Sequence, residues 1–186
     1  MDRRFASDYH CFIVRRFDRT DAGRRLHFAS AMTMTGHSDG DDASTGVSYL
    51  ELAEVLMNQG SQPNEDLREL WSRIVFNILV SNTDDHLRNH GFILVPGNGW
   101  KLSQAHDMNP VSHADGLKLN ITDADNALDL ELAREVAEYF RLELCKADEI
   151  IEAFRGVVGQ WRMLAQRVGL SVREQDRMAG AFRLAE

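Results

Sequence analysis

The sequence has only two cysteines, and it lacks any long apolar run. Cys11 and Cys145 are far apart, and neither belongs to a Cys-x-x-Cys or Cys/His pattern, which argues against a disulfide framework and a structural zinc site. The first residues contain no signal-peptide core, and no apolar stretch approaches the length of a membrane span. We therefore expect a protein without a membrane segment that works in the reducing cytoplasm.

An excess of basic charge is also absent. The 29 acidic residues outnumber the 21 lysines and arginines, and the net charge of −8 opposes nonspecific binding to nucleic acid. Arginines are concentrated before residue 26, but aspartates are interspersed among them. We interpret this stretch as a solvated surface, with contact to nucleotide phosphates or to an acidic partner as the alternatives. No direct contact with nucleic acid is expected.

The clearest pattern in the chain is helical periodicity. With 186 residues, 44% of them hydrophobic, the chain suits one domain over residues 1–186. Ser48-Tyr49-Leu50-Glu51 fits a capping box and predicts a helix that stops before Gly60. A second helix is predicted from Pro63, because the apolar residues between 67 and 79 recur at helical spacing and form a wide stripe.

Later segments predict more helix and a little strand. Residues 128–142, residues 146–168 and the segment after Ser171 carry helical patterns. Residues 92–95 and 100–102 flank a turn and read as a β-hairpin. Shorter strands are expected over 9–14 and 117–121, and the acidic run 37–44 is expected to be a mobile loop. The predicted fold class is mainly α with a small β-hairpin.

Carboxylates, amides and imidazoles gather directly after the second helix. This stretch reads Asn82-Thr83-Asp84-Asp85-His86-Leu87-Arg88-Asn89-His90-Gly91-Phe92, and His106-Asp107-Met108-Asn109-Pro110 follows the hairpin. The hairpin is expected to bring Asp107 back beside Asp84 and Asn89. One carboxylate is then free to take a proton, while an amide and a second carboxylate are able to hold a hard cation through oxygen. These are the groups that phosphoryl transfer requires.

The two motifs and their spacing resemble those of HipA-type serine/threonine kinases, the toxin half of a bacterial toxin–antitoxin pair. The resemblance implies a protein-kinase-like C-terminal lobe that uses ATP and Mg²⁺ to phosphorylate a protein substrate. It implies that Asp84 is the catalytic base and that Asn89 and Asp107 are the magnesium ligands. His106 is a departure, since the family usually has tyrosine before this second aspartate.

The resemblance also suggests roles around the site. Phe17 lies in the link that borders the adenine pocket in the family, although Arg15 stands where a glutamate is usual. His86 is expected to orient the loop by hydrogen bonding. Arg88 is expected to meet a phosphate or the substrate, with a surface ion pair as the alternative. Asp85 is interpreted either as a solvated neighbour of Asp84 or as added negative charge that attracts the metal.

One half of a kinase is not recognisable. A complete kinase has a strand-rich lobe with a phosphate-covering loop and a lysine that grips the phosphates. The first lysine here is Lys101, which follows the catalytic motif, and no Gly-rich loop precedes it. We therefore predict a helical lobe whose nucleotide-gripping lobe is absent or is supplied by a separate chain. A helix-turn-helix antitoxin is a further expected partner.

Two alternatives stay open. The first is an inactive pseudokinase or antitoxin-binding module, which the missing lysine favours. The second is a zinc or two-metal hydrolase built from His86, His90, His106, Asp84, Asp85 and Asp107. His86 and His90 have the i, i+4 spacing of a zincin helix, but Leu87 stands where that mechanism needs a glutamate base.

Overall fold

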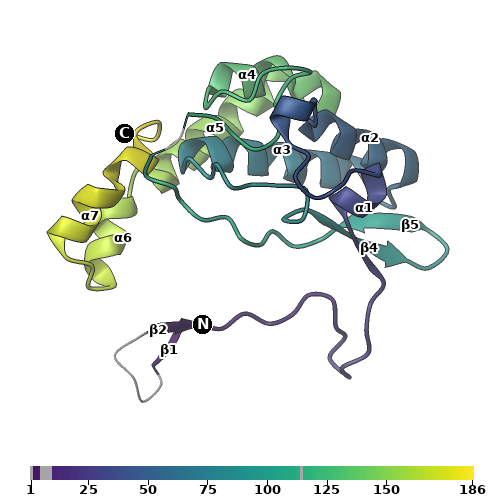
Figure 1. The fold of residues 1–186 in the computed structure, drawn as a ribbon, viewed down its shortest axis with the longest axis horizontal. Helices are drawn as coiled ribbons and strands as arrows, with labels where there is room; N and C mark the ends of the chain where they lie inside the picture. The colour runs from purple at the N-terminus through teal and green to yellow at the C-terminus, as the bar shows by residue number, and fades with distance from the viewer. Residues whose placement is uncertain (1, 5–9, 114) are drawn as a thin grey trace.

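The computed structural model describes residues 2–4, 10–113 and 115–186. Helices gather around a long central helix, a small sheet lies along one side, and the N-terminal segment runs beneath them (Figure 1). The helices are α1 (Ala31–Thr35), α2 (Tyr49–Gln59), α3 (Pro63–Leu79), α4 (Leu130–Glu135), α5 (Leu144–Val158), α6 (Trp161–Arg167) and α7 (Val172–Met178). Short 3₁₀ turns are η1 (Ala43–Thr45), η2 (Ala137–Phe140) and η3 (Ala179–Phe182). The strands are β1 (Asp2–Arg4), β2 (His10–Phe12), β3 (Phe28–Ser30), β4 (Gly91–Val95) and β5 (Gly99–Leu102).

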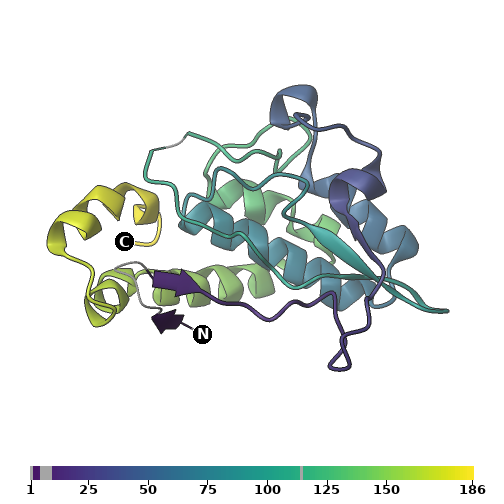
Figure 2. The same cartoon turned by 60° about the horizontal axis from the view of Figure 1, so that its bottom comes forward.

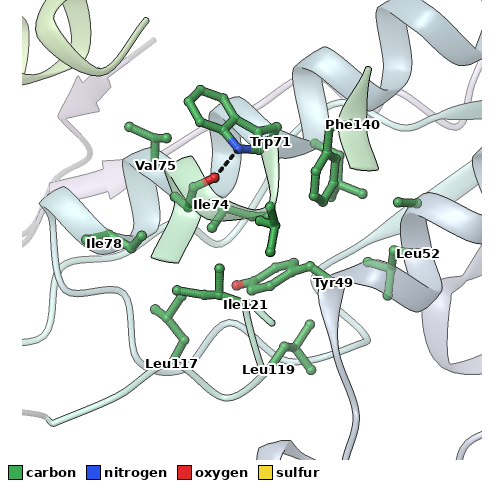
Figure 3. Packing of buried hydrophobic residues seen from close by; sticks show 14 of the residues in the cluster. Tyr49, Leu52, Trp71, Ile74, Val75, Ile78, Leu117, Leu119, Ile121 and Phe140 are labelled. Atoms are coloured by element: carbon green, nitrogen blue, oxygen red, sulfur yellow. Dashed lines mark hydrogen bonds between the residues drawn. The ribbon is translucent and has the colours of Figure 1, made fainter. Parts of the chain in front are cut away.

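The central helix α3 forms as predicted and is buried on several sides. It starts with Pro63, which suits the first helical position because that N–H has no partner within the helix. Its buried apolar residues are Leu67, Leu70, Trp71, Ile74, Val75, Ile78 and Leu79. The indole of Trp71 donates to the Ala133 carbonyl at 2.7 Å, which fastens α3 to α4 (Figure 3). This packing gives the segment that follows α3 a rigid base.

Helix α2 begins at the predicted capping box. The Ser48 side chain accepts from the backbone of Glu51, and the Glu51 carboxylate accepts from the Ser48 N–H at 3.2 Å. The helix packs on α3 through Leu52, Leu56 and their neighbours, which are fully buried. Caps of this kind satisfy N–H groups that the first helical turn leaves unpaired, so the sequence pattern predicts the start of the helix well.

The predicted hairpin is confirmed and gains a third strand. Strands β4 and β5 pair antiparallel, and β3 pairs with the other edge of β4, with Ala29 opposite Phe92. Strand β3 and the short helix α1 after it were not predicted. The pairing of β3 with β4 places residues 28–31 beside residues 90–91, at the end of the loop that contains Asp84 and Asn89. The structure therefore confirms a mainly α fold with a small antiparallel sheet.

The two other predicted strands have different outcomes. The strand predicted over 9–14 forms only over His10–Phe12, as β2, which pairs with β1, and residue 9 lies outside the described residues. The two-stranded sheet of β1 and β2 lies apart from the three-stranded sheet of β3, β4 and β5 in both views (Figures 1 and 2). The strand predicted over 117–121 is wrong, because this segment makes only isolated bridges, such as Ser48 with Asn120.

The C-terminal third is helical, as predicted, but in shorter pieces. The pattern over 128–142 becomes α4 followed by η2, and the pattern over 146–168 becomes α5 and α6, separated at Gly159. Ser171 caps α7 through a second capping box. The acidic run 37–44 contains the start of η1, which Asp42 caps by accepting from Ser44. In the part of the chain that the structure describes, none of the helices combines the length and apolarity that crossing a bilayer requires.

Candidate active site

The candidate catalytic loop connects the buried end of α3 to strand β4. Helix α3 ends at Leu79, and Ser81 then adopts a left-handed conformation with φ of 51°, which turns the chain out of the helix. At the other end of the loop, the His90 carbonyl accepts from the Ala31 N–H at 2.8 Å. The loop is thus held at both ends by elements of the core.

The structure brings Asp84 and Asn89 together. The Asn89 side chain is nearly buried, and its Nδ2 donates to the Asp84 carbonyl at 3.2 Å. That orientation leaves the Asn89 Oδ1 as the amide atom able to bind a cation. The Asp84 side chain is exposed, and its carboxylate has no hydrogen bond among the described residues. It has the freedom that a proton acceptor needs.

Asp107 lies on a segment that is tied to the same loop at two points. The Ser103 N–H donates to the Gly91 carbonyl at 2.7 Å, and the Val111 N–H donates to the Ser81 carbonyl at 3.3 Å. Asp107 itself is exposed and left-handed, with φ of 58°.

The Asp107 carboxylate has one hydrogen bond, accepted by Oδ1 from Asn109 Nδ2 at 2.6 Å. No hydrogen bond joins this carboxylate to Asp84 or Asn89 in the described part of the chain. A cation site shared by Asn89 and Asp107 therefore stays a prediction.

His86 organises the loop through its backbone. Its N–H donates to the Asp84 carbonyl at 3.0 Å, and its carbonyl accepts from the Asn89 N–H at 2.8 Å. The imidazole Nδ1 is buried and has no hydrogen-bond partner in the structure. The hydrogen bonds that His86 makes within the loop therefore come from its main chain, whereas we expected one from its side chain.

Arg88 points to the acidic run that follows α1. It forms an ion pair with Asp39, which is one of the two outcomes expected for it. Both residues border a cavity of about 230 Å³ that Asp84 and His86 also line. Asp41, Asp42 and Lys118 form other parts of the wall, and Lys118 is paired with Asp42 at 3.5 Å.

Phe17 lies beside the segment that carries Asp107. Its ring centroid is 5.4 Å from that of His106 and 5.9 Å from that of Phe28. The link expected to border the adenine pocket thus packs against the residue before the expected metal ligand. Contact of Phe17 with an adenine base remains a prediction.

Asp85 corrects one expectation. The residue is only 1% exposed, so it is not a solvated neighbour of Asp84. Its Oδ2 accepts hydrogen bonds from Tyr49 Oη at 2.6 Å, Asn77 Nδ2 at 2.7 Å and His90 Nε2 at 2.8 Å. Sequence reasoning missed this cluster, although an asparagine within the apolar stripe of α3 was a signal that something polar is buried there.

The surroundings of Asp85 keep it ionised. Burial raises the pKa of the Asp85 carboxyl, but the imidazole of His90 and the hydroxyl of Tyr49 more than offset this effect, and the net pKa lies below its ordinary value. Burial and the adjacent carboxylate raise the pKa of Tyr49 well above its ordinary value. The phenol therefore stays protonated and serves as a donor.

The zincin alternative fails on geometry. Residues 86–90 form turns rather than a helix. The Nε2 of His90 is occupied by Asp85, and this imidazole is 2% exposed. The described residues contain no group of three or more histidine, cysteine or acidic side chains that could hold a metal ion.

Comparisons with known proteins agree with the fold. The family described as the HipA-like C-terminal domain matches residues 2–162. A Haemophilus influenzae protein named "Putative kinase" is 30% identical over 106 residues, which cover 54% of this chain and 31% of that protein. HipA of Shewanella oneidensis, solved in complex with HipB and its operator DNA, superimposes with a TM-score of 0.77 at 18% identity. The match covers 100% of this chain and 49% of that one, so the chain spans at most about half the length of these two relatives.

Proposed function

The chain belongs to the family of HipA-like C-terminal domains, and from this premise we propose that it is the catalytic lobe of a kinase. In this proposal it transfers the terminal phosphoryl group of Mg-ATP to a serine or threonine of a protein. We place this activity in the cytoplasm and expect a helix-turn-helix antitoxin as a regulatory partner, because the solved HipA relative is bound to HipB.

The observation that carries the proposal is the pairing of a free carboxylate with an anchored amide. Asp84 is exposed at the foot of α3, and Asn89 is folded back onto its carbonyl. In the proposed reaction Asp84 accepts the proton of the attacking hydroxyl. The hydroxyl oxygen bonds to the terminal phosphorus, and the bond from that phosphorus to the bridging oxygen of ADP breaks.

The donor set fits magnesium. Asn89 Oδ1 and the carboxylate of Asp107 are hard oxygen ligands, and Mg²⁺ commonly takes one or two protein ligands together with waters and phosphates. When bound, the ion would neutralise charge on the phosphates. In this proposal Asn89 and Asp107 hold it on the side of the loop where Asp84 is exposed.

We propose that the lysine that binds the ATP phosphates lies outside these 186 residues. Their first lysine is Lys101, and they cover 49% of the solved relative. A strand-rich lobe outside these residues would supply this lysine, while Phe17 would border the adenine. Arg88 would reach a phosphate only after leaving Asp39. The second candidate is an antitoxin-binding module without turnover, which the complex of the solved relative with HipB supports.

A phosphoryl-transfer assay tests the proposal. The full chain is incubated with Mg²⁺ and γ-labelled ATP, alone and with any strand-rich lobe encoded beside it, and labelled protein is measured. Asp84→Asn should lower transfer by at least about 100-fold, because general-base catalysis contributes about 10²–10⁴-fold. Asp107→Ala should also lower transfer, because it removes a proposed magnesium ligand.

Asp123→Asn is the matched control. It removes an exposed carboxylate outside the candidate site and should leave transfer unchanged. Transfer that is equal in all four proteins would reject the assignment. Stable capture of the antitoxin without any transfer, in either mixture, would select the binding module instead.

A further inference from the structure

We propose that Asp85 is a positioning residue that sets the geometry of the catalytic loop while touching neither metal nor substrate. Asp84 and Asp85 are neighbours in sequence with opposite surroundings, since the first is exposed and the second is 1% exposed. A buried carboxylate is tolerated where hydrogen-bond donors compensate for its lost hydration. The donors around Asp85 show what it holds in place.

The three donors to Asp85 come from three different parts of the fold. Tyr49 is the first residue of α2, Asn77 lies in the last turns of α3, and His90 is the residue before β4. All three side chains are at most 2% exposed. Their hydrogen bonds, of 2.6 to 2.8 Å, meet on one carboxylate oxygen. Short bonds to an ionised acceptor are among the strongest in proteins.

Two further contacts fix the donors themselves. Asn82 Nδ2 donates to Asn77 Oδ1 at 3.0 Å, which leaves the Asn77 Nδ2 to face Asp85. The His90 ring stands edge-on to the Tyr49 ring, with centroids 5.7 Å apart and an interplanar angle of 90°. The cluster of Tyr49, Asn77, Asn82, Asp85 and His90, here the Asp85 cluster, is therefore interlocked.

Members of the Asp85 cluster lie next to Asp84 and Asn89, the proposed base and metal ligand, in the sequence. Asn82 and Asp85 flank Asp84 in the chain, and His90 directly follows Asn89. Asn89 reaches back to the Asp84 carbonyl, so a shift of either neighbour changes the distance between the proposed base and the proposed metal ligand. Fixing Asp85 thus fixes both.

The burial of Asp85 also excludes direct roles for it. Its Oδ2 accepts from three donors, and the residue is 1% exposed. It lies outside the set of residues that line the cavity beside Asp84 and Arg88. Displacement of a reacting group by about 1 Å can cost about 100-fold in rate, so a residue of this kind acts on turnover through its neighbours.

Asp66 provides a matched control. It is also a buried carboxylate on α3, 3% exposed, and it accepts from Gln62 Nε2 at 3.0 Å and from the Leu102 N–H at 2.9 Å. Its hydrogen bond to Leu102 joins it to strand β5, and none of the hydrogen bonds in the described part of the chain joins it to the catalytic loop. Asp66→Asn therefore alters another buried, hydrogen-bonded carboxyl group at a different place in the fold.

The experiment compares Asp85→Asn, Tyr49→Phe and Asp66→Asn in the full chain. Tyr49→Phe deletes one donor without removing the carboxylate, and it covers the case in which Asp85→Asn does not fold. Amide hydrogen exchange should accelerate at least about tenfold at His86 and Asn89 in the first two variants. In Asp66→Asn the acceleration should instead appear at Leu102. Equal exchange at His86 and Asn89 in all three variants would overturn the proposal.

Turnover gives the second readout, and this part rests on the proposed function. At equal folded fraction, kcat should fall about 10- to 100-fold in Asp85→Asn and less in Tyr49→Phe, with less than about a twofold change in Asp66→Asn. If Asp84→Asn abolishes transfer while Asp85→Asn retains it within twofold, the positioning role is wrong and the kinase assignment stands. If no transfer is found in any protein, the kinase assignment fails, and hydrogen exchange alone decides the positioning role.

Discussion

Replacing aspartate by asparagine should change the free energy of unfolding by very different amounts at the adjacent positions 84 and 85. Asp84→Asn alters an exposed side chain without a hydrogen bond in the described structure, and we expect its free energy of unfolding to change by less than about 0.5 kcal/mol. Asp85→Asn removes a buried charge that accepts three hydrogen bonds. A hydrogen bond to a charged group contributes about 1.5–3 kcal/mol. Breaking a buried charged interaction costs about 3–5 kcal/mol, and we expect a loss in this range.

The assay is urea unfolding at pH 7, monitored by circular dichroism. In a thermal melt, the same loss of 3–5 kcal/mol corresponds to a decrease in Tm of about 6–20 °C for a domain of this size. A double-mutant cycle of Asp85→Asn with Tyr49→Phe should show a coupling of at least about 1 kcal/mol, because the two side chains are in contact. Equal stability of Asp84→Asn and Asp85→Asn would refute the reasoning, since it would mean that the buried bonds contribute nothing net.

The pH dependence of this effect has a definite sign. The pKa of Asp85 is lowered in the folded protein, so its contribution to stability is present above the unfolded pKa of about 3.9. It is lost as the pH falls through the folded pKa. The difference in unfolding free energy between wild type and Asp85→Asn should therefore be present at pH 7 and should shrink as the pH falls below about pH 4.

Three further predictions concern the frame around the site. Ser48→Ala should destabilise the protein by about 1 kcal/mol, measured as a lower urea midpoint, because it removes the cap of α2. Trp71→Ala should cost about 3–5 kcal/mol in the same assay, because it leaves a cavity and an unpaired Ala133 carbonyl. The hydrogen bond to Glu51, at 2.7 Å, raises the pKa of His37. Its contribution is therefore full below about pH 6.5 and is lost at higher pH, so His37→Gln should lower stability more at pH 6 than at pH 8.

Local patterns predicted the elements that depend on local physics. Helices α2 and α3 and the hairpin of β4 and β5 were found because capping residues, helical spacing and turn residues act within a few positions. Strand β3 was missed because its stability comes from pairing with β4, more than sixty residues later. The strand expected over 117–121 did not form because the backbone of Asn120 bonds instead to Val47 and Tyr49.

The candidate site shows the same division. The motif indicated Asp84 and Asn89, and the structure joins them through a side-chain hydrogen bond. Asp85 was misjudged because its burial depends on Tyr49, which lies 36 positions away in the sequence. No spacing rule connects a helix-starting tyrosine to a loop carboxylate, and only the packing of α2 against α3 does so.

The most direct test of the account is whether Asn89 and Asp107 hold one divalent ion beside Asp84. Mn²⁺ added with a non-hydrolysable ATP analogue replaces Mg²⁺ and broadens the NMR signals of nearby amides. The account predicts that the amides of Asp84, Asn89 and Asp107 broaden together, while that of Asp123 stays sharp. If the Asp107 amide stays sharp while those of Asp84 and Asn89 broaden, residue 107 is not part of the site and the proposed kinase chemistry is contradicted.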